Sequence, residues 1–174
     1  PVLFGRVAAA QAAQPAMRVA DVDPPRTATC EGADFDLPLR PDADPERAWV
    51  RLARSRAPIG LLLMDQSVMA GVGNIYRTEL LWRARLHPEA PGRSLDRAGF
   101  DALWTDAHRL LEIGVDRGLI VTRGEDRPPA RTFKGRVNIF KKPRCPRCKG
   151  PVRGWAMANR RVFACETCAQ PPQL

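Results

Sequence analysis

Four of the five cysteines lie in the last thirty residues and form two C-x-x-C pairs, Cys145/Cys148 and Cys165/Cys168, sixteen residues apart. Each pair can turn two sulfurs toward one metal ion, and two pairs supply the tetrahedron of thiolates that Zn²⁺ accepts without geometric penalty. Since four protein ligands leave no open coordination position, the sequence predicts one structural Zn²⁺ that activates no water. A redox dithiol is the alternative for such pairs, and iron could bind the same sulfurs.

The spacer between the two cysteine pairs is long enough for a β-hairpin that returns the second pair to the first. Near its predicted tip, Arg160 and Arg161 could reach the phosphates of a nucleic-acid backbone, although two arginines could also serve solubility alone. Units shorter than about 40 residues rarely fold without a staple, so we expect metal removal to unfold this hairpin.

The basic residues are concentrated toward the end of the chain. Residues 127–165 contain twelve Lys or Arg and no Asp or Glu, whereas the rest of the chain has 16 basic and 19 acidic residues. Exposed charged faces usually mix signs, so a block of one sign indicates a polyanionic partner. No apolar run approaches the ~18 residues of a membrane span, and the clustered cysteines favour metal binding in a reducing cytoplasm over a secreted disulfide scaffold.

Helix signals follow one another from residue 44 onward. Asp44 can cap a helix that starts at Pro45, Glu46 favours the positive end of its dipole, and Pro58 should end it. Further helices are expected at 59–68, 75–86 and 95–116, with a tight turn at 70–74 and Gly118 as a C-terminal cap. The longest helix carries one apolar stripe, composed of Phe100, Leu103, Trp104, Ala107, Leu110, Leu111 and Gly114.

These signals divide the chain into four predicted segments. Residues 1–43 include possible strands at 2–7 and 17–22 and the lone thiol Cys30, and they are expected to be a linker or a remnant of an N-terminal β-rich catalytic domain. Residues 44–118 form a helical domain, and residues 119–141 a polar connector whose residues 137–140 could start a small hairpin. Residues 142–170 form the zinc finger.

Two sequence features combine into a family resemblance. Leu62-Leu63-Met64-Asp65-Gln66 leads into Ala70-Gly71-Val72-Gly73-Asn74-Ile75-Tyr76-Arg77-Thr78-Glu79, and Arg160 stands five residues before the third cysteine of the finger. Together they resemble the C-terminal half of the formamidopyrimidine-DNA glycosylase / endonuclease VIII family over residues 45–169. The resemblance implies a mainly α fold: a helix–two-turn–helix domain, then a small four-cysteine zinc β-hairpin finger, with a remnant of an N-terminal β-sandwich.

The resemblance also implies roles for individual residues. Gly73 and Asn74 present backbone N–H groups at the start of a helix, which is a ready phosphate site. In the family, residues matching Asn74 and Arg160 contact phosphates around the lesion, and position alone adds Arg161. Asn74 could instead be a helix cap without a ligand. Glu79 matches the family pattern as a structural anchor.

Other polar side chains are expected to have local roles. Asp65 and Gln66 should satisfy nearby backbone groups. His87 and His108 are isolated in the sequence and are expected at the surface or in helix packing.

By resemblance, the complete protein would remove oxidised bases as a bifunctional DNA glycosylase and AP lyase through a Schiff base on an N-terminal proline. Here Val2, not glutamate, follows Pro1, so we expect this chain to contain no catalytic residue and to be mainly the DNA-clamping half. The expected partner is double-stranded DNA with an oxidised base or abasic site, bound by a monomer without membrane association in the bacterial cytoplasm, at the nucleoid. The alternatives are a non-catalytic zinc-ribbon nucleic-acid-binding module and a zinc-stabilised protein-interaction domain.

Overall fold

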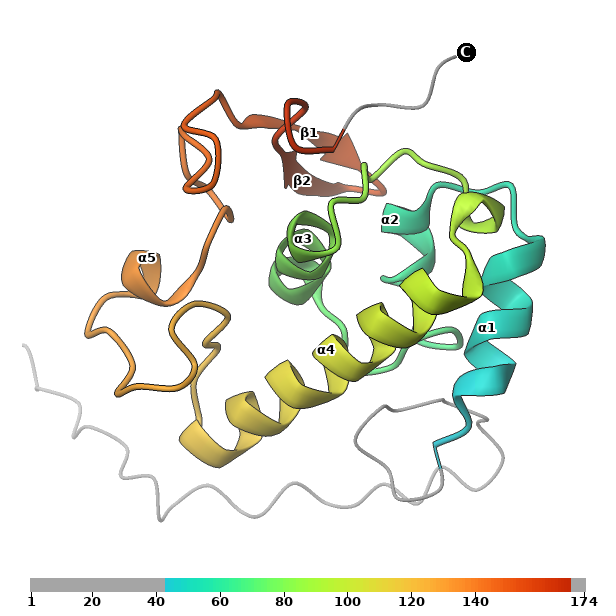
Figure 1. Ribbon diagram of the computed structural model, residues 1–174, viewed down its shortest axis with the longest axis horizontal. Helices are drawn as coiled ribbons and strands as arrows, with labels where there is room; N and C mark the ends of the chain where they lie inside the picture. The colour runs from blue at the N-terminus through green and yellow to red at the C-terminus, as the bar shows by residue number, and fades with distance from the viewer. Residues whose placement is uncertain (1–42, 170–174) are drawn as a thin grey trace, which may run out of the picture. The chain divides into compact units, whose positions relative to one another are not determined.

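Helices precede a small β-hairpin along the chain (Figure 1). The computed structural model describes residues 43–169. Their elements, in order, are α1 (Pro45–Arg54), α2 (Ile59–Leu62), α3 (Asn74–Arg83), the 3₁₀ turn η2 (Gly92–Ser94), α4 (Arg97–Arg117), α5 (Phe133–Arg136), β1 (Arg153–Met157) and β2 (Arg160–Ala164). This arrangement confirms the predicted mainly helical domain followed by a β-hairpin finger.

Helices α1 to α4 enclose one hydrophobic core. Phe100 of α4 is fully buried at its centre, with its ring 5.4 Å from that of Trp49 on α1 and 5.9 Å from that of Trp104. The predicted stripe of α4 supplies much of this core, which also contains Leu52, Ile59, Leu63, Met69, Val72, Leu80, Leu81, Leu103, Ala107, Leu110 and Leu111. Burial of such side chains contributes ~1.5–3 kcal/mol each, which is enough to hold short helices together.

The helix boundaries follow local capping chemistry. Asp44 accepts a hydrogen bond from the Glu46 N–H at 2.9 Å, as predicted for the start of α1. Asp96 caps α4 in the same way, so this helix runs from 97 to 117 rather than from 95 to 116. Gly118 ends α4 with φ of 59°, a left-handed conformation that glycine adopts without steric cost.

Two predicted helices are shorter than expected. The helix predicted at 59–68 stops at Leu62, because Asp65 accepts from the Ser67 N–H and hydroxyl and thereby favours a turn over another helical turn. The helix predicted to reach residue 86 ends at 83. Two residues later, Arg85 adopts the left-handed conformation with φ of 58°. The Leu86 N–H then donates to the Leu81 carbonyl at 2.9 Å, which terminates the helix.

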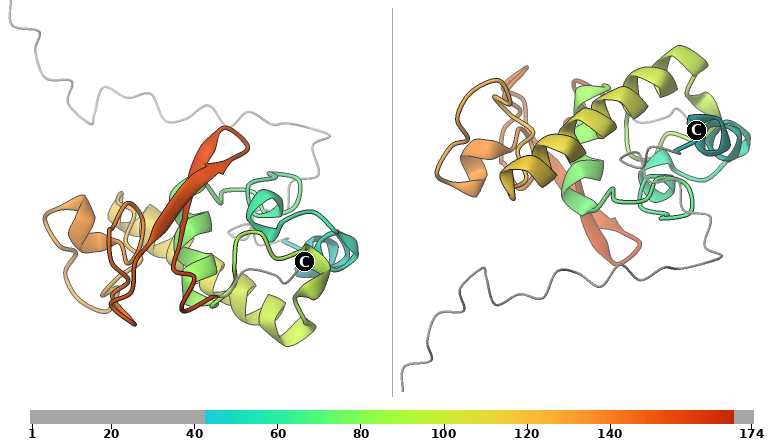
Figure 2. Two further views of the ribbon diagram at one scale, coloured as in Figure 1. Left: turned by 90° about the horizontal axis from the view of Figure 1, so that it is seen from above. Right: turned by 90° about the horizontal axis from the view of Figure 1, so that it is seen from below.

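Strands β1 and β2 form the antiparallel hairpin predicted between the cysteine pairs. Its two-residue loop consists of Ala158 and Asn159, with φ of 49° and 60°, the twist that suits a tight hairpin. The hairpin lies against α3, as two orthogonal views agree (Figures 1 and 2). The other predicted hairpin is wrong: residues 137–140 form no strand, because a side chain of α3 takes up their backbone N–H groups, as described below.

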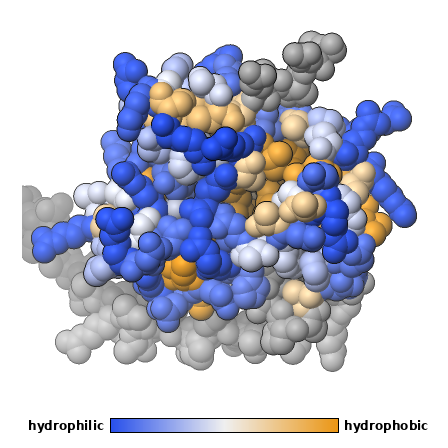
Figure 3. All heavy atoms as spheres, in the orientation of Figure 1, coloured by the Kyte–Doolittle hydropathy of each residue, from blue (hydrophilic) through white to orange (hydrophobic). Residues whose placement is uncertain are grey.

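Some expectations lie outside the described residues, namely the strands at 2–7 and 17–22, the lone thiol Cys30 and the β-sandwich remnant as a whole. Among the described residues, no helix combines the length and apolar character needed to cross a membrane. On the face shown in Figure 3, hydrophilic side chains dominate over the connector, at the left of the view.

Candidate metal centre and nucleic-acid interface

The four cysteines predicted to bind metal converge. Their sulfurs all lie within 4.8 Å of one another, with Cys145 and Cys168 at 3.8 Å and Cys148 and Cys165 at 3.3 Å. Zn–S bonds of about 2.3 Å in a tetrahedron place sulfurs about 3.8 Å apart, so the cluster has the size of a tetrathiolate metal site. The structure therefore confirms a four-cysteine cluster that can hold one metal ion.

The backbone around the first cysteine pair directs its sulfurs inward. The Cys145 carbonyl accepts the Lys149 N–H at 2.9 Å, and Lys149 takes φ of 64° to close this turn. Burial opposes ionisation of Cys145, but N–H groups of Cys148 and the indole of Trp82 lower the pKa of its thiol to about 6. Burial and the neighbouring sulfurs raise the pKa of Cys168 to about 12. A cation among the four sulfurs would favour their thiolate forms.

The two arginines of the hairpin point in different directions. Strand alternation puts Arg161 on the face opposite the fully buried Val162, with its guanidinium 5.9 Å from the Phe163 ring and donating to the Gly154 carbonyl. Arg160 lies on the face of Val162, beyond the buried part of the strand, and lines a hollow beside α3. Arg160 is therefore the arginine whose charge faces the start of that helix.

The predicted turn before α3 lies beside this hairpin tip. Gly73 occupies the cap position and Asn74 is the first helical residue, with no side chain capping the helix. Thus Asn74 does not act as the cap that the sequence allowed. Instead its Nδ2 donates to the Arg161 carbonyl at 3.1 Å, which joins the turn to the hairpin across 87 positions of sequence.

The hollow between turn and hairpin has a volume of about 420 Å³ and is open to solvent. Gly73, Asn74 and Arg160 all line it, together with Ile75, Tyr76, Ile120, Phe133, Phe140 and Lys141. The N-terminus of α3 contributes a partial positive charge here, and Arg160 and Lys141 add full ones. No acidic side chain is among the lining residues, so the hollow suits an anion such as a phosphate.

A third cation, Arg77, was not singled out by the sequence. Its side chain is fully buried in α3, where it donates to the Gly60 carbonyl at 3.2 Å and to Asn74 Oδ1. Burial and the nearby Arg160 lower the pKa of its guanidinium. The contact with Asn74 Oδ1 holds the amide so that Nδ2 faces the hairpin. The signal in the sequence was the i, i+3 spacing of Asn74 and Arg77 on one helix face.

Glu79 connects the helical domain to the connector and finger. Its buried carboxylate accepts the N–H groups of Asn138, Ile139 and Phe140 at 2.7, 2.8 and 2.9 Å, and the Thr122 hydroxyl at 2.7 Å. The carboxylate thus replaces the strand partner that residues 137–140 were expected to find. Its position agrees with the structural anchor expected from the resemblance.

Among the remaining singled-out side chains, Asp65 and Gln66 have local roles, whereas His87 packs on strand β1 rather than at the surface or between helices. Asp65 binds Ser67 as described, and Gln66 accepts the Gly71 N–H at 3.0 Å, as predicted for both. His87 is buried and stacks on Trp155 with ring centroids 5.5 Å apart, whereas His108 is exposed beside Glu112.

Known proteins resemble this chain over the same region. The sequence model of the formamidopyrimidine-DNA glycosylase H2TH domain matches residues 36–125. Endonuclease 8 1 of Mycobacterium tuberculosis is 44% identical over 137 residues, which cover 75% of this chain and 51% of that protein. Formamidopyrimidine-DNA glycosylase of Chloroflexus aurantiacus is 35% identical over 135 residues, which cover 75% of this chain and 49% of that protein. The chain thus spans about half the length of the relatives it matches.

Solved structures show the same fold. The MutM (Fpg) protein of Thermus thermophilus superposes with a TM-score of 0.67 at 30% identity, over 81% of this chain and 55% of that one. Lactococcus lactis Fpg (MutM) in complex with a Fapy-dG-containing DNA gives a TM-score of 0.64 at 26% identity, over 77% of this chain and 50% of that chain. Because the H2TH match alone spans more than half of its residues, the chain belongs to the formamidopyrimidine-DNA glycosylase H2TH domain family.

Proposed function

We propose that this chain is the DNA-clamping half of a base-excision repair protein, and that the hollow beside α3 takes a backbone phosphate. The observation that carries the proposal is the hydrogen bond from Asn74 Nδ2 to the Arg161 carbonyl. It brings the helix start and the finger arginine, 86 positions apart in sequence, to one open site.

The site's chemistry matches a phosphodiester. Free N–H groups and the dipole at the start of α3 attract an anion, and Arg160 can add a charge-assisted hydrogen bond. Arg77 places a further buried positive charge beneath Asn74. Gly73 contributes its backbone, since nothing lies within 4 Å of the position of an added Cβ and a ligand can approach closely. Arg161 is assigned a secondary contact from the opposite face of the hairpin.

The relatives supply the class of DNA. Their names are endonuclease 8 and formamidopyrimidine-DNA glycosylase, and one neighbour was solved with Fapy-dG-containing DNA. We therefore assign double-stranded DNA with an oxidised base or an abasic site as the partner. The complete protein would be a bifunctional DNA glycosylase and AP lyase acting through an N-terminal proline, as a monomer at the bacterial nucleoid. The described residues receive no catalytic role.

The four-cysteine cluster is assigned one structural Zn²⁺. Cys145, Cys148, Cys165 and Cys168 would hold it, and a closed set of four thiolates would leave it without an open position. When bound, the metal would stabilise the two turns that carry the cysteines and thus the base of hairpin β1–β2. The residues that meet DNA are those of the hairpin tip and of α3.

The proposal is tested by fluorescence anisotropy with a labelled duplex that contains a tetrahydrofuran abasic analogue. Intact duplex and single-stranded RNA of equal length serve as comparisons. If ~6 phosphates are contacted, log affinity should fall with log salt at a slope of about −5. A slope near zero, or equal binding of single-stranded RNA, would contradict the proposed clamp.

Two matched variants locate the site. Arg160→Ala should weaken binding ~10-fold and reduce the salt slope by about 1, because one phosphate contact is lost. Arg54→Ala removes an equal charge from the last turn of α1, away from the hollow, and should change affinity little. Equal losses in the two variants would mean that overall charge, not this site, binds DNA.

A further inference from the structure

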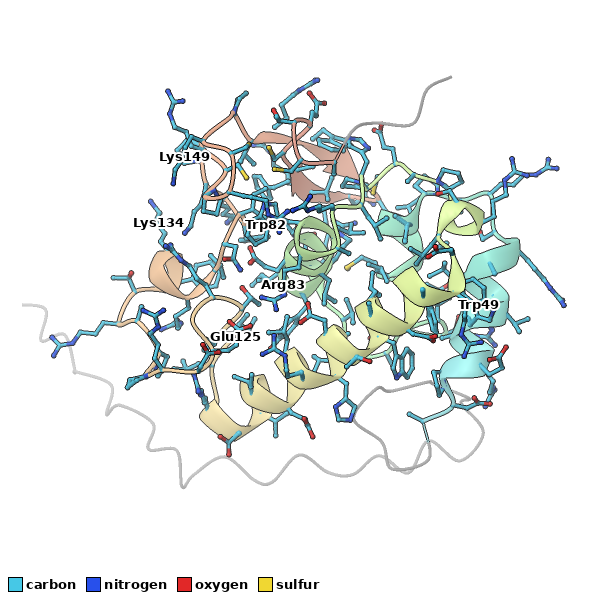
Figure 4. All side chains as sticks on the ribbon, viewed as in Figure 1. Trp49, Trp82, Arg83, Glu125, Lys134 and Lys149 are labelled. Atoms are coloured by element: carbon cyan, nitrogen blue, oxygen red, sulfur yellow. The ribbon has the colours of Figure 1, made fainter. Side chains whose placement is uncertain are left out.

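The side chain of Trp82 extends from helix α3 toward the cysteine-bearing finger (Figure 4). Trp82 is the penultimate residue of α3, and its half-buried side chain packs on a small cluster formed by Ile139, Cys145 and Cys165. The indole thus joins the helical domain to the metal centre. Neither the phosphate site nor the cysteine ligation requires a tryptophan here.

The indole N–H points at a metal-binding sulfur. Trp82 Nε1 donates to Cys145 Sγ at 3.2 Å. An indole N–H can only donate, and a hydrogen bond strengthens when its acceptor carries negative charge. The contact is therefore most favourable when Cys145 is a thiolate, which is the form that a metal ion binds.

The other contact that orients the Trp82 ring comes from Arg147, which lies between the two cysteines of the first pair. Arg147, between Cys145 and Cys148, places its guanidinium 4.3 Å from the centroid of the Trp82 ring. The same guanidinium donates to the Trp82 carbonyl at 3.1 Å. This cation–π contact stabilises the orientation of the indole ring, since an arginine over a tryptophan face contributes an attraction of ~0.5–1 kcal/mol or more. The cysteine pair and the tryptophan therefore fix each other.

We propose that Trp82 is a positioning residue of the metal centre, whose N–H holds the metal-bound Cys145 thiolate and ties metal affinity to helix α3. The inference rests on the metal centre proposed above. Groups that hydrogen-bond to metal ligands orient those ligands, and their removal typically weakens metal binding ~10–100-fold. The N–H also withdraws charge from the sulfur, so removing it makes transfer of charge from sulfur to a bound metal easier.

The test uses Co²⁺ as a spectroscopic probe in the whole chain, followed by displacement with Zn²⁺. In Trp82→Phe, the sulfur-to-cobalt charge-transfer band should move to longer wavelength, and Zn²⁺ should pass to a chromophoric chelator ~10-fold faster than from wild type. Trp104→Phe is the matched control, because that partly buried tryptophan of α4 contacts Phe100 and should change neither measurement.

A second replacement separates the hydrogen bond from packing. Incorporation of 3-benzothienylalanine at position 82 exchanges only the N–H for sulfur, so the ring shape and the Arg147 stack remain. It should reproduce the band shift even if the Phe variant folds poorly. An unshifted band with 3-benzothienylalanine would overturn the proposal, even if Trp82→Phe lowered thermal stability. Failure of wild type to bind Co²⁺ or Zn²⁺ would instead refute the metal centre itself.

Discussion

Replacement of Glu79 should destabilise the protein more than most single substitutions. Its fully buried carboxylate accepts three backbone N–H groups and one hydroxyl, all at 2.7–2.9 Å. Hydrogen bonds to charged groups contribute ~1.5–3 kcal/mol each, and a buried donor left unpaired costs about 1–3 kcal/mol. Since such terms are not additive, we expect Glu79→Ala to lower the free energy of unfolding by about 4 kcal/mol or more.

Glu79→Gln gives the quantitative version of this test. Either orientation of the amide turns its NH₂ group toward backbone N–H donors, because each carboxylate oxygen accepts at least one of them. At least one backbone donor then loses its partner, and the acceptor no longer carries a negative charge. We therefore expect the free energy of unfolding to fall by about 2 kcal/mol. This variant should still fold, since small domains have ~5–15 kcal/mol of stability.

The measurement is urea unfolding in zinc-containing buffer, followed by far-ultraviolet circular dichroism. Glu112→Gln is the control, because Glu112 is an exposed α4 residue beside His108, and such changes are usually within ±0.5 kcal/mol. If Glu79→Gln unfolded at the same urea concentration as the control, the carboxylate would not be the anchor of residues 138–140, and the reasoning would be refuted.

Three further predictions concern the finger and its surroundings. A strong chelator should lower the melting temperature and make the backbone after the exposed Arg160 cleavable by trypsin, because the hairpin depends on metal to stay folded; an unchanged melt and digest would contradict this. Ala158→Asn should raise the free energy of unfolding by up to ~1 kcal/mol, since asparagine tolerates φ of 49° better than alanine, and an unchanged urea midpoint would count against it. Burial lowers the pKa of His87 below its ordinary 6.5, so the unfolded chain takes up a proton first as pH falls. Stability should therefore drop as the pH falls through 6.5, and less so in His87→Gln; parallel pH profiles would exclude His87 as the cause.

The sequence predicted most accurately what depends on local chemistry. Asp44 marked the start of α1, Gly118 the end of α4, and the spacing of the cysteines predicted both their convergence and the hairpin between them. In each case the residue that determines the structure lies within a few positions of the structure it determines, or repeats at a fixed spacing.

Sequence reasoning failed where distant residues decide the outcome. Residues 137–140 resemble a strand, but Glu79, about 60 positions earlier, takes their N–H groups. Arg77 and Trp82 looked like ordinary helix residues, because the Gly60 carbonyl and Cys145 Sγ, to which they donate, come close only in the folded chain. The DNA-binding roles of Asn74 and Arg160 remain predictions, although the structure brings both to one hollow.

The two attachments of α3 to the finger have a consequence for association with any ligand. Asn74 meets the hairpin tip at one end of the helix, and Trp82 meets Cys145 near the other, eight residues or about 12 Å along the axis. With both ends held, finger and helix cannot rotate independently. The conformational entropy of aligning them is therefore lost during folding rather than at binding, so a ligand that contacts both meets a preorganised surface.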